Sequence, residues 1–212
     1  MYDRQIIQAA VAVLDTGKRS TGGDMTAEAA GTTGWPASTR RRLLNAAMVL
    51  FGQYSFAGTS LQMIADELGL TKAAIYYHFR TREQLLLALM DPILEEIGAA
   101  VEAAGERNGP AARAEAMLAG YAAVVAKNRA VAAITIFDPG VRAVLRNHPE
   151  WSAAIDRQLA LLAGTQTSVA GSINAMVTLT GLAGAAASAP HGLDDETLCA
   201  HLFDVGRRTL GL

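Results

Sequence analysis

The chain has 212 residues, of which 51% are apolar and 18% charged, and its formal net charge is −2. This length allows one or two domains with a sizeable buried core, and the composition is that of a soluble globular protein. The only cysteine, Cys199, excludes an intrachain disulfide and gives no support to a zinc site or a redox pair, so we expect a buried, inert thiol.

Residues 1–37 are expected to form a flexible N-terminal arm. Apolar residues between Ile6 and Leu14 could make one short amphipathic helix, but this run is too short and too weakly basic at its start for a signal peptide. Glycine, serine, threonine and alanine dominate from Thr16 to Ser38, as in a linker. Two alternatives stay open: the short helix docks on the body or on a second subunit, or Met25 is the true translation start.

The first core helix is predicted from about Ser38 or Thr39 to Tyr54. Its start carries three consecutive arginines, although the positive end of a helix disfavours cations. Such an arrangement makes sense beside phosphates, and simple solvation is the alternative. The predicted buried stripe of this helix is Leu43, Leu44, Ala47, Leu50 and Phe51.

The stretch from Thr59 to Phe79 predicts two short helices joined by a tight turn. Thr59 and Gln62 have the spacing of a capping box, and Gly69 is a suitable helix stop. Thr71 can cap the second helix. The residues predicted to face inward are Leu61, Ile64, Ala65 and Leu68 from the first helix and Ala74, Ile75 and Phe79 from the second.

The outer side of the second helix has the chemistry of a DNA contact. Lysine, tyrosine and histidine side chains can bind phosphate oxygens, and small alanines let a helix approach base edges. A helix-turn-helix places its second helix in the major groove. Between Ser38 and Arg82, six basic residues stand against two acidic ones, a net charge of +4, and the remainder of the chain is net acidic. The outward residues are Lys72, Ala73, Tyr76, Tyr77 and His78.

The run GTSLQMIADELGLTKAAIYYHFRTREQLL, from Gly58 to Leu86, resembles the DNA-binding signature of the tetracycline-repressor (TetR) family. The resemblance is strong from Thr39 to about Met90. It implies an all-α homodimer with a three-helix helix-turn-helix domain over residues 38–82 and a larger helical domain over residues 83–212 that binds an effector and dimerises. The candidate DNA-binding residues are Arg41, Arg42, Thr59, Ser60, Thr71, Lys72, Ala73, Ala74, Tyr76, Tyr77, His78 and Arg82.

Two positions depart from the family pattern. Ala73-Ala74 replaces a common Gly-Thr in the second helix, which removes a hydroxyl that could contact DNA. Arg82 stands where a lysine is common, and an arginine still serves a phosphate. The base preference of relatives therefore does not transfer to this chain.

A connecting helix is predicted to begin at Thr81, where Gln84 completes a second capping-box pattern. Pro92 should kink or break this helix and help to set its angle. No strand pattern is present. Further helices are predicted at about Ala111–Lys127, Arg129–Phe137, Gly140–Asn147, Glu150–Ala163, Ser168–Ala189 and Asp194–Leu210.

The run from Leu159 to Gly192 contains no Asp, Glu, Lys or Arg, so a membrane span has to be considered. Its serine, threonine and asparagine residues, and the excess of alanine and glycine over leucine, favour a buried helix. With the last helix it could form a dimer face, where the resemblance also places one, or an ordinary core. The residues expected to permit close helix packing are Gly171, Ala175, Gly181 and Gly184.

The effector is expected to be a mainly apolar small molecule in a pocket of the C-terminal helices. Tyr121, Asn174 and His148 could supply its polar contacts. Each apolar candidate, taken alone, fits a core position as well. The candidate lining residues are Met90, Leu94, Met117, Tyr121, Ile134, Phe137, His148, Trp151, Ile155, Asn174, Met176 and Leu179.

No catalytic motif, metal-ligand spacing or phosphate loop is found in the sequence, so we expect neither an enzyme nor a bound cofactor or metal. The resemblance to the TetR family implies a cytoplasmic transcriptional regulator that binds a palindromic operator as a dimer and is released by its effector. Repression is the usual sense in the family, and activation is the other. The alternative function is a helical small-molecule carrier or interaction module without DNA binding, in which Thr59–Phe79 packs inward.

Overall fold

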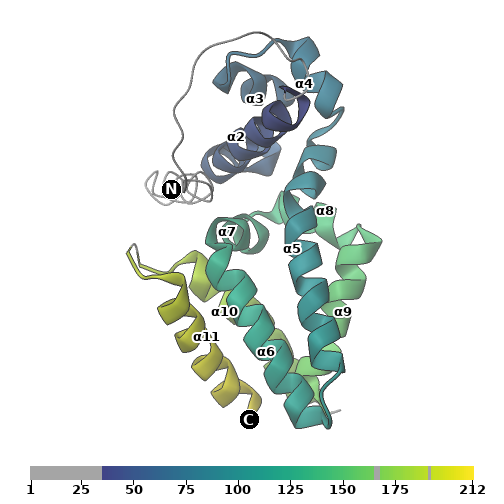
Figure 1. The fold of residues 1–212 in the computed structure, drawn as a ribbon, viewed down its shortest axis with the longest axis vertical. Coiled ribbons are helices and arrows are strands. Elements are labelled where there is room, and N and C mark those ends of the chain that lie inside the picture. Colours follow the sequence, from purple (N-terminus) through teal and green to yellow (C-terminus); the bar gives the residue numbers. More distant parts are fainter. Residues whose placement is uncertain (1–34, 165–167, 191) are drawn as a thin grey trace, which may run out of the picture. The chain divides into compact units, whose positions relative to one another are not determined.

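The computed structural model describes residues 35–164, 168–190 and 192–212, and in these residues it contains helices and no strands (Figure 1). The all-α prediction is confirmed. The chain divides into two compact units, Met1–Leu86 and Leu87–Leu212, and the division falls within helix α5 (Arg82–Gly105). The predicted arm, including the possible start at Met25, lies outside the described residues up to residue 34.

The N-terminal unit packs α2 (Trp35–Gly58), α3 (Leu61–Glu67) and α4 (Lys72–His78) around a small core. Leu43, Phe51, Ile64 and Ile75 are almost completely buried there. Burial of such side chains contributes about 1.5–3 kcal/mol each, which is why short helices can be stable in this unit. The regular part of α2 ends before Ser55, whose φ of 64° lies in the left-handed region, close to the predicted end at Tyr54.

The C-terminal unit contains the predicted helices with ends that differ by a few residues. Three of them begin at a proline, because the first helical position needs no N–H and has the φ that the ring imposes. The helices are α6 (Pro110–Lys127), α7 (Arg129–Phe137), α8 (Pro139–Arg146), α9 (Pro149–Ala163), α10 (Val169–Ala187) and α11 (Asp195–Leu210).

Helix α5 continues through Pro92, so the predicted break at this residue is wrong. Its effect on the angle of the helix stays a prediction. Proline removes the N–H that would bond to the carbonyl four residues before it. Pro92 lies on an exposed side of the helix, where water can satisfy the freed carbonyl.

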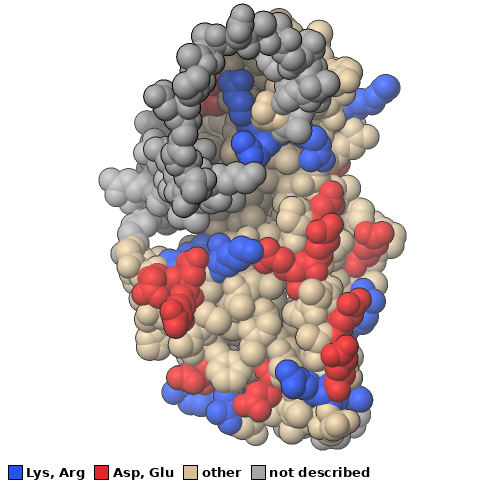
Figure 2. Space-filling view, in the orientation of Figure 1, with Lys and Arg blue, Asp and Glu red and all other residues tan. Residues whose placement is uncertain are grey.

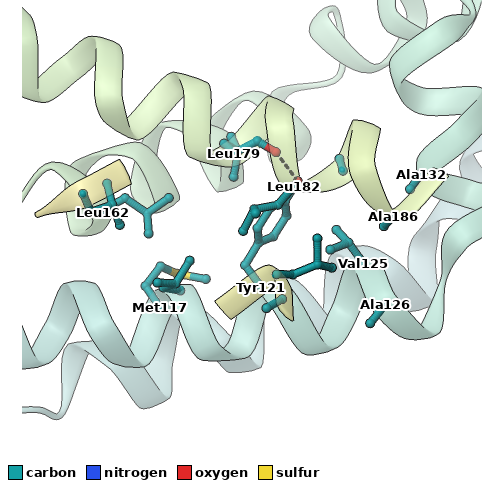
Figure 3. Close-up of a cluster of buried hydrophobic side chains, with 14 of the residues drawn as sticks. Met117, Tyr121, Val125, Ala126, Ala132, Leu162, Leu179, Leu182 and Ala186 are labelled. Carbon is teal, nitrogen blue, oxygen red and sulfur yellow. Dashed lines mark hydrogen bonds between the residues drawn. The ribbon is translucent and has the colours of Figure 1, made fainter. Parts of the chain in front are cut away.

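A large apolar cluster fills the space between α6, α7, α9, α10 and α11 (Figure 3). Met117 and Tyr121 enter it from α6, and Leu162 from α9. The Tyr121 hydroxyl donates a hydrogen bond of 2.8 Å to the Leu179 carbonyl of α10. This bond satisfies the polar end of an otherwise apolar contact.

Gly206 of α11 packs closely against α6. A Cβ at this position would overlap the side chain of the buried Leu118, which would have to shift. Cys199, also on α11, is a half-buried free thiol, and burial raises its pKa, which keeps it protonated and unreactive.

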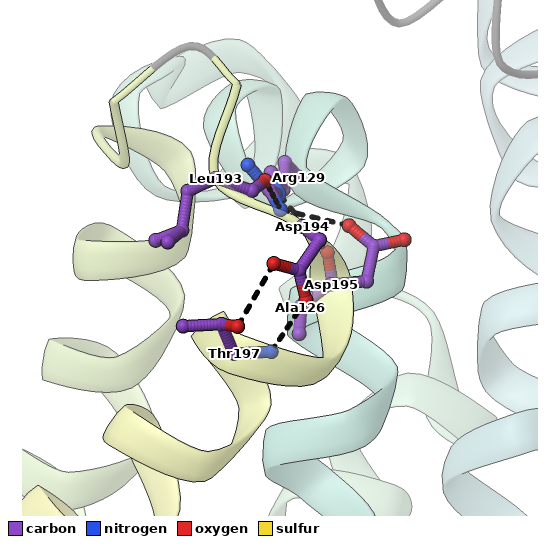
Figure 4. Close-up of polar contacts among 6 residues, drawn as sticks. All are labelled: Ala126, Arg129, Leu193, Asp194, Asp195 and Thr197. Atoms are coloured by element: carbon purple, nitrogen blue, oxygen red, sulfur yellow. Dashed lines mark hydrogen bonds and ion pairs between the residues drawn. The ribbon is translucent and has the colours of Figure 1, made fainter.

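Arg129 joins the start of α7 to the segment that leads into α11 (Figure 4). Its guanidinium donates to the carbonyls of Ala126 and Leu193 at 3.2 and 2.7 Å, and pairs with Asp195 at 2.8 Å. Asp194 caps α11 by accepting from the Thr197 N–H at 2.8 Å, and the hydrogen bonds from Thr197 lower the pKa of that carboxyl.

By length and composition alone, α10 could cross a membrane, and so could α6 and α7 together despite a bend of 97° between them. Core helices of soluble proteins have the same composition. In the structure α10 packs against α6, α7, α9 and α11, as the buried-helix interpretation requires.

Candidate functional site

Helix α4 is anchored on one side and open on the other. Thr71 caps it as predicted by accepting a hydrogen bond from the Ala74 N–H, and Ile75 and Phe79 are buried beneath it. The opposite side exposes Lys72, Ala73, Tyr76 and Tyr77. Tyr77 is 80% exposed, although a tyrosine normally buries much of its ring. These side chains are therefore available to a partner.

Contacts among the outward side chains limit how they move. The Lys72 ammonium lies 5.7 Å from the centre of the Tyr76 ring, and the His78 ring meets the Tyr77 ring edge-on at 5.1 Å. Arg40 lies over the Phe79 ring. Arg41 and Arg42 are exposed on α2, as a phosphate contact or plain solvation would both require.

The start of α3 differs from the prediction. Ser60, and not Thr59, is the capping residue, since its hydroxyl accepts from the Met63 N–H at 3.1 Å. Thr59 is 1% exposed, and its hydroxyl shares its one proton between the carbonyls of Leu50 and Ser55, at 3.1 and 2.8 Å. The prediction that the Thr59 side chain contacts DNA is thus corrected: its hydroxyl fastens α3 to the end of α2.

Arg82 also has a structural role that the sequence did not indicate. Its Nη1 donates to the carbonyls of Phe56, Ala57 and Thr59 at 2.9 to 3.0 Å, and the guanidinium lies 5.0 Å from the centre of the Phe56 ring. These carbonyls follow the regular part of α2, which ends before Ser55, and free acceptors at such a helix end attract cations. The expected phosphate contact of Arg82 stays a prediction, and the structure adds that its Nη1 is held within the protein.

A shallow recess of about 440 Å³ separates the starts of α3 and α4. Lys72, Tyr76 and Ser60, all predicted site residues, line it. Arg80, Thr81 and Gln62 line it too and were missed. Arg80 and Thr81 follow α4 directly, so their position after a candidate DNA-contacting helix was the signal that could have found them.

The charge of this surface suits a polyanion. In the N-terminal unit the basic side chains of Arg41, Arg42, Lys72 and Arg80 are exposed. On the face shown in Figure 2, carboxylates gather on the C-terminal unit instead. Charge asymmetry of this kind attracts nucleic acid to one end of a protein whose net charge is −2.

The C-terminal unit contains a cavity of about 80 Å³ bounded by α5, α6 and α7, with contributions from α9 and α10. Its lining is almost wholly apolar. The polar side-chain groups among the described lining residues belong to Tyr121, Asn128, Thr135 and the indole N–H of Trp151. The volume is smaller than the roughly 300–1,000 Å³ of common ligand pockets, so a bound molecule has to be compact or the helices have to move apart.

Comparison with known proteins finds a family that matches the helix-turn-helix region. Residues 43–89, which contain most of α2, all of α3 and α4 and the start of α5, match the family model described as bacterial regulatory proteins, tetR family. Over these residues the chain is similar to the TetR family. This result confirms the resemblance seen in the sequence.

The curated relatives match this chain over limited lengths. The chain is 41% identical over 49 residues to YerO, an uncharacterized HTH-type transcriptional regulator of Bacillus subtilis, covering 23% of this chain and 17% of YerO. It is 34% identical over 84 residues to RutR, an HTH-type transcriptional regulator of Escherichia coli, covering 40% of this chain and 34% of RutR. Both relatives are thus matched over about a third of their length or less.

Solved structures extend the similarity to the whole fold. The ketosteroid transcriptional regulator KstR2 of Mycobacterium tuberculosis has a TM-score of 0.64 at 17% identity and covers 85% of this chain and 97% of its own. SCO3833 of Streptomyces coelicolor, a TetR-family transcriptional regulator, has the same TM-score at 18% identity, with 90% and 95% covered. At these identities the similarity shows the fold alone. The relatives named here are transcriptional regulators, and none is described as an enzyme.

Three residues of the ligand-site prediction line the cavity: Met90, Tyr121 and Trp151. Met117 and Leu179 lie instead in the apolar cluster, and Phe137 and Met176 are exposed. His148 precedes α9 with its Nδ1 buried and unpaired. The other predicted residues that do not line the cavity are Leu94, Ile134, Ile155 and Asn174.

The lining residues that the sequence did not indicate come mostly from the junction of α6 and α7. That bend decides which side chains face α5, and helical periodicity within one helix carries no information about it. The missed residues are Ile93, Ile97, Val124, Val125, Asn128, Val131, Ala132, Thr135, Ile136 and Ala183.

Proposed function

We propose that this protein is a dimeric transcriptional repressor that binds a palindromic DNA operator and is released by a small, mainly apolar effector. The observation that carries the proposal is the outer side of α4. Four of its side chains are exposed while Ile75 and Phe79 hold the helix in place, so this side has no packing role in the chain. In this proposal two copies of α4 enter successive major grooves.

The roles on DNA follow from chemistry and position. Lys72, Ala73 and Tyr76 are proposed to meet base edges, with Ala74 beside them at the N-terminal end of the helix. Tyr77 and His78 contact the phosphate backbone, as do Ser60, Arg41 and Arg42. Arg80, which shares the recess with Lys72, is added to the phosphate contacts.

The dimer is supported by an apolar stripe on α10. Val169, Ile173, Met176 and Val177 recur at helical spacing and are 77%, 55%, 45% and 51% exposed. A Cβ at Gly181 or Gly184 would meet no atom within 4 Å, so a second helix has room to approach there. Gly171 and Ala175, expected on the same face, are buried within the chain.

The proposed mechanism couples the cavity to DNA through α5, because Met90, Ile93 and Ile97 of that helix form part of its wall. An effector that binds better when the wall is displaced favours a conformation that no longer fits the operator. The protein is proposed to act in the cytoplasm, where the operator is.

The proposal is tested by selecting bound sequences from random duplex DNA at fixed salt with the full-length protein. A Lys72→Ala, Tyr77→Ala variant removes two exposed side chains without disturbing the core. Arg157→Ala, an exposed residue of α9, is the control that removes the same charge. We expect a palindromic motif with the wild type and the control, and at least a tenfold loss of affinity in the double variant.

Salt dependence adds a second readout. Because a dimer carries two copies of Lys72, the slope of log affinity against log salt should fall by about two if each contacts a phosphate, and stay unchanged if both read bases only. Recovery of no motif by the wild type would reject the repressor and favour the carrier without DNA binding.

A further inference from the structure

The two hydroxyl groups that line the α5–α6–α7 cavity are already committed as donors. The Tyr121 hydroxyl donates to the Leu179 carbonyl, and the Thr135 hydroxyl donates to the Val131 carbonyl, both at 2.8 Å. Each hydroxyl has one proton, so what remains at both oxygens is acceptor capacity.

The side-chain donors of Asn128 are also used, and the orientation of its amide is fixed by its hydrogen-bond partners. Its side-chain nitrogen lies 2.9 Å from the Val124 carbonyl and 3.2 Å from a Glu96 carboxylate oxygen. Both partners are acceptors, so the group that faces them must be the amide nitrogen, whose two protons are then used. Asn128 Oδ1 is left without a hydrogen bond inside the described part of the chain.

The described lining residues of the cavity carry no charged side chain, and the charged residues beside it are paired with opposite charges. No Asp, Glu, Lys, Arg or His is among the lining residues. Lys127 pairs with Glu96 at 2.7 Å, and Arg129 is held by Asp195 and the Leu193 carbonyl. Burial raises the pKa of Tyr121, so its hydroxyl stays protonated and neutral. An anionic ligand would find no cation among the described lining residues, and burial of an uncompensated charge is unfavourable.

We propose that this cavity takes a compact, uncharged, mainly apolar molecule that carries a hydrogen-bond donor such as a hydroxyl, and that Asn128 Oδ1 accepts its hydrogen bond. This inference rests on the proposed effector role of the cavity and narrows the chemical class. A cavity of about 150 Å³ holds benzene, and this one measures about 80 Å³, so entry of even one ring displaces the wall.

Asn128 also connects ligand binding to helix α5. The same side chain that accepts from the ligand donates to Glu96 of α5. A ligand that moves Asn128 or parts α5 from the α6–α7 junction therefore acts on the bond that holds the two together. Lys127 bonds to the other oxygen of that carboxylate, so both junction residues depend on Glu96.

The test uses the full-length protein without DNA and three probes: phenol, toluene and benzoate. Phenol and toluene differ by a hydroxyl in place of a methyl group of similar size, and benzoate adds a negative charge. In calorimetric titrations we expect phenol and toluene to bind and benzoate to bind at least tenfold more weakly than phenol. Benzoate binding as tightly as phenol would overturn the inference.

The donor is tested by substitution and by a signal in the wild type. Asn128→Leu should weaken phenol binding about tenfold and leave toluene binding unchanged. Ala183→Leu, which fills the cavity, should weaken the binding of both probes. Equal loss of phenol and toluene in Asn128→Leu would refute the hydrogen bond. If this variant does not fold, the wild-type spectrum decides: phenol should shift the Asn128 side-chain NH2 resonances more than toluene does, and equal shifts would refute it.

A parallel titration separates this inference from the proposed function. Operator affinity is measured with and without phenol. Binding at Asn128 with unchanged operator affinity supports the ligand class and rejects the effector role, whereas operator binding without any phenol or toluene binding rejects the ligand class and leaves the repressor standing.

Discussion

A single guanidinium holds the turn between α2 and α3. Arg82 reaches three carbonyls from its place at the start of α5 and stacks on Phe56, which itself packs edge-on against Phe51. Hydrogen bonds to a charged group contribute about 1.5–3 kcal/mol, and the planar group adds ring contact that an ammonium lacks. Arg82 therefore fastens the segment that joins α2 to α3.

Arg82→Ala should lower the free energy of unfolding of the N-terminal unit by about 2–3 kcal/mol, since three carbonyls lose a donor. Arg82→Lys should lower the free energy of unfolding by only about 1 kcal/mol relative to the wild type. Urea denaturation measures both. Arg80→Ala, an exposed neighbour, is the control and should stay within about 0.5 kcal/mol of the wild type. An Arg82→Ala protein as stable as this control would show that the clamp is dispensable.

Burial of Tyr121 should make the folded protein less stable at alkaline pH. Because burial raises its pKa in the folded state above the usual value near 10, folding stabilises the protonated form. Its contribution is complete below about pH 10 and is lost as pH rises from there towards the folded pKa.

The Tyr121→Phe variant should lose about 1 kcal/mol at pH 7, the cost of its hydrogen bond to Leu179. Above about pH 10 its stability should fall less steeply than that of the wild type, because phenylalanine does not titrate. Chemical denaturation at pH 7 and at pH 10.5 measures the difference. Parallel decline of the two proteins with pH would contradict the assignment.

At the scale of helices, close approach sets the limit on substitution. Gly206 of α11 faces the Leu118 side chain of α6, whereas a Cβ at Gly98 of α5 would meet nothing within 4 Å. The same glycine-to-alanine change therefore has opposite expected effects in two helices of one unit.

Gly206→Ala should destabilise the protein by about 1–3 kcal/mol through overpacking. Gly98→Ala should stabilise it by up to about 1 kcal/mol, because alanine restricts the unfolded chain and favours the helix. Thermal unfolding of the pair distinguishes these outcomes. A Gly206→Ala protein with an unchanged midpoint would mean that Leu118 moves aside without cost.

The helices could be predicted from sequence because their ends carry local signals. Gly69, Thr71 and the prolines that begin α6, α8 and α9 act within one or two residues of where they stand. The choice between adjacent hydroxyls at Thr59 and Ser60 was not local: which of them caps α3 depends on the carbonyls of Leu50 and Ser55, which only the folded α2 brings near.

The candidate DNA surface was predictable for a similar reason, and the cavity was not. Side chains of α4 face outward by helical period relative to Ile75, one buried anchor. The cavity needs the relative placement of α5, α6 and α7, and Asn128 faces it only because the chain bends there. Tertiary geometry of this kind leaves no periodic trace in the sequence.

For the whole molecule, association is expected to depend on the α10 stripe. Ile173 lies within it and is 55% exposed. A glutamate there would be carried into an apolar interface without a partner, which costs several kcal/mol over the two copies of a dimer. The fold of each chain should be unaffected, because the position is exposed in the single chain.

Ile173→Glu should convert the protein to a monomer in sedimentation experiments and weaken operator binding at least a hundredfold, since one half-site is then bound at a time. Ala153→Glu, an exposed position on α9, is the control that adds the same charge. A dimeric Ile173→Glu protein would exclude this face as the interface.

The clamp by Arg82 also fixes where this chain can be recombined with another. Arg82 belongs to the connecting helix by position and to the N-terminal unit by its contacts, and the buried Leu85 and Leu86 follow it in that unit. A chimera that joins this helix-turn-helix to a foreign sensing domain must therefore keep its own sequence through Leu86. A junction placed directly after α4 would leave the transplanted helices without their fastening.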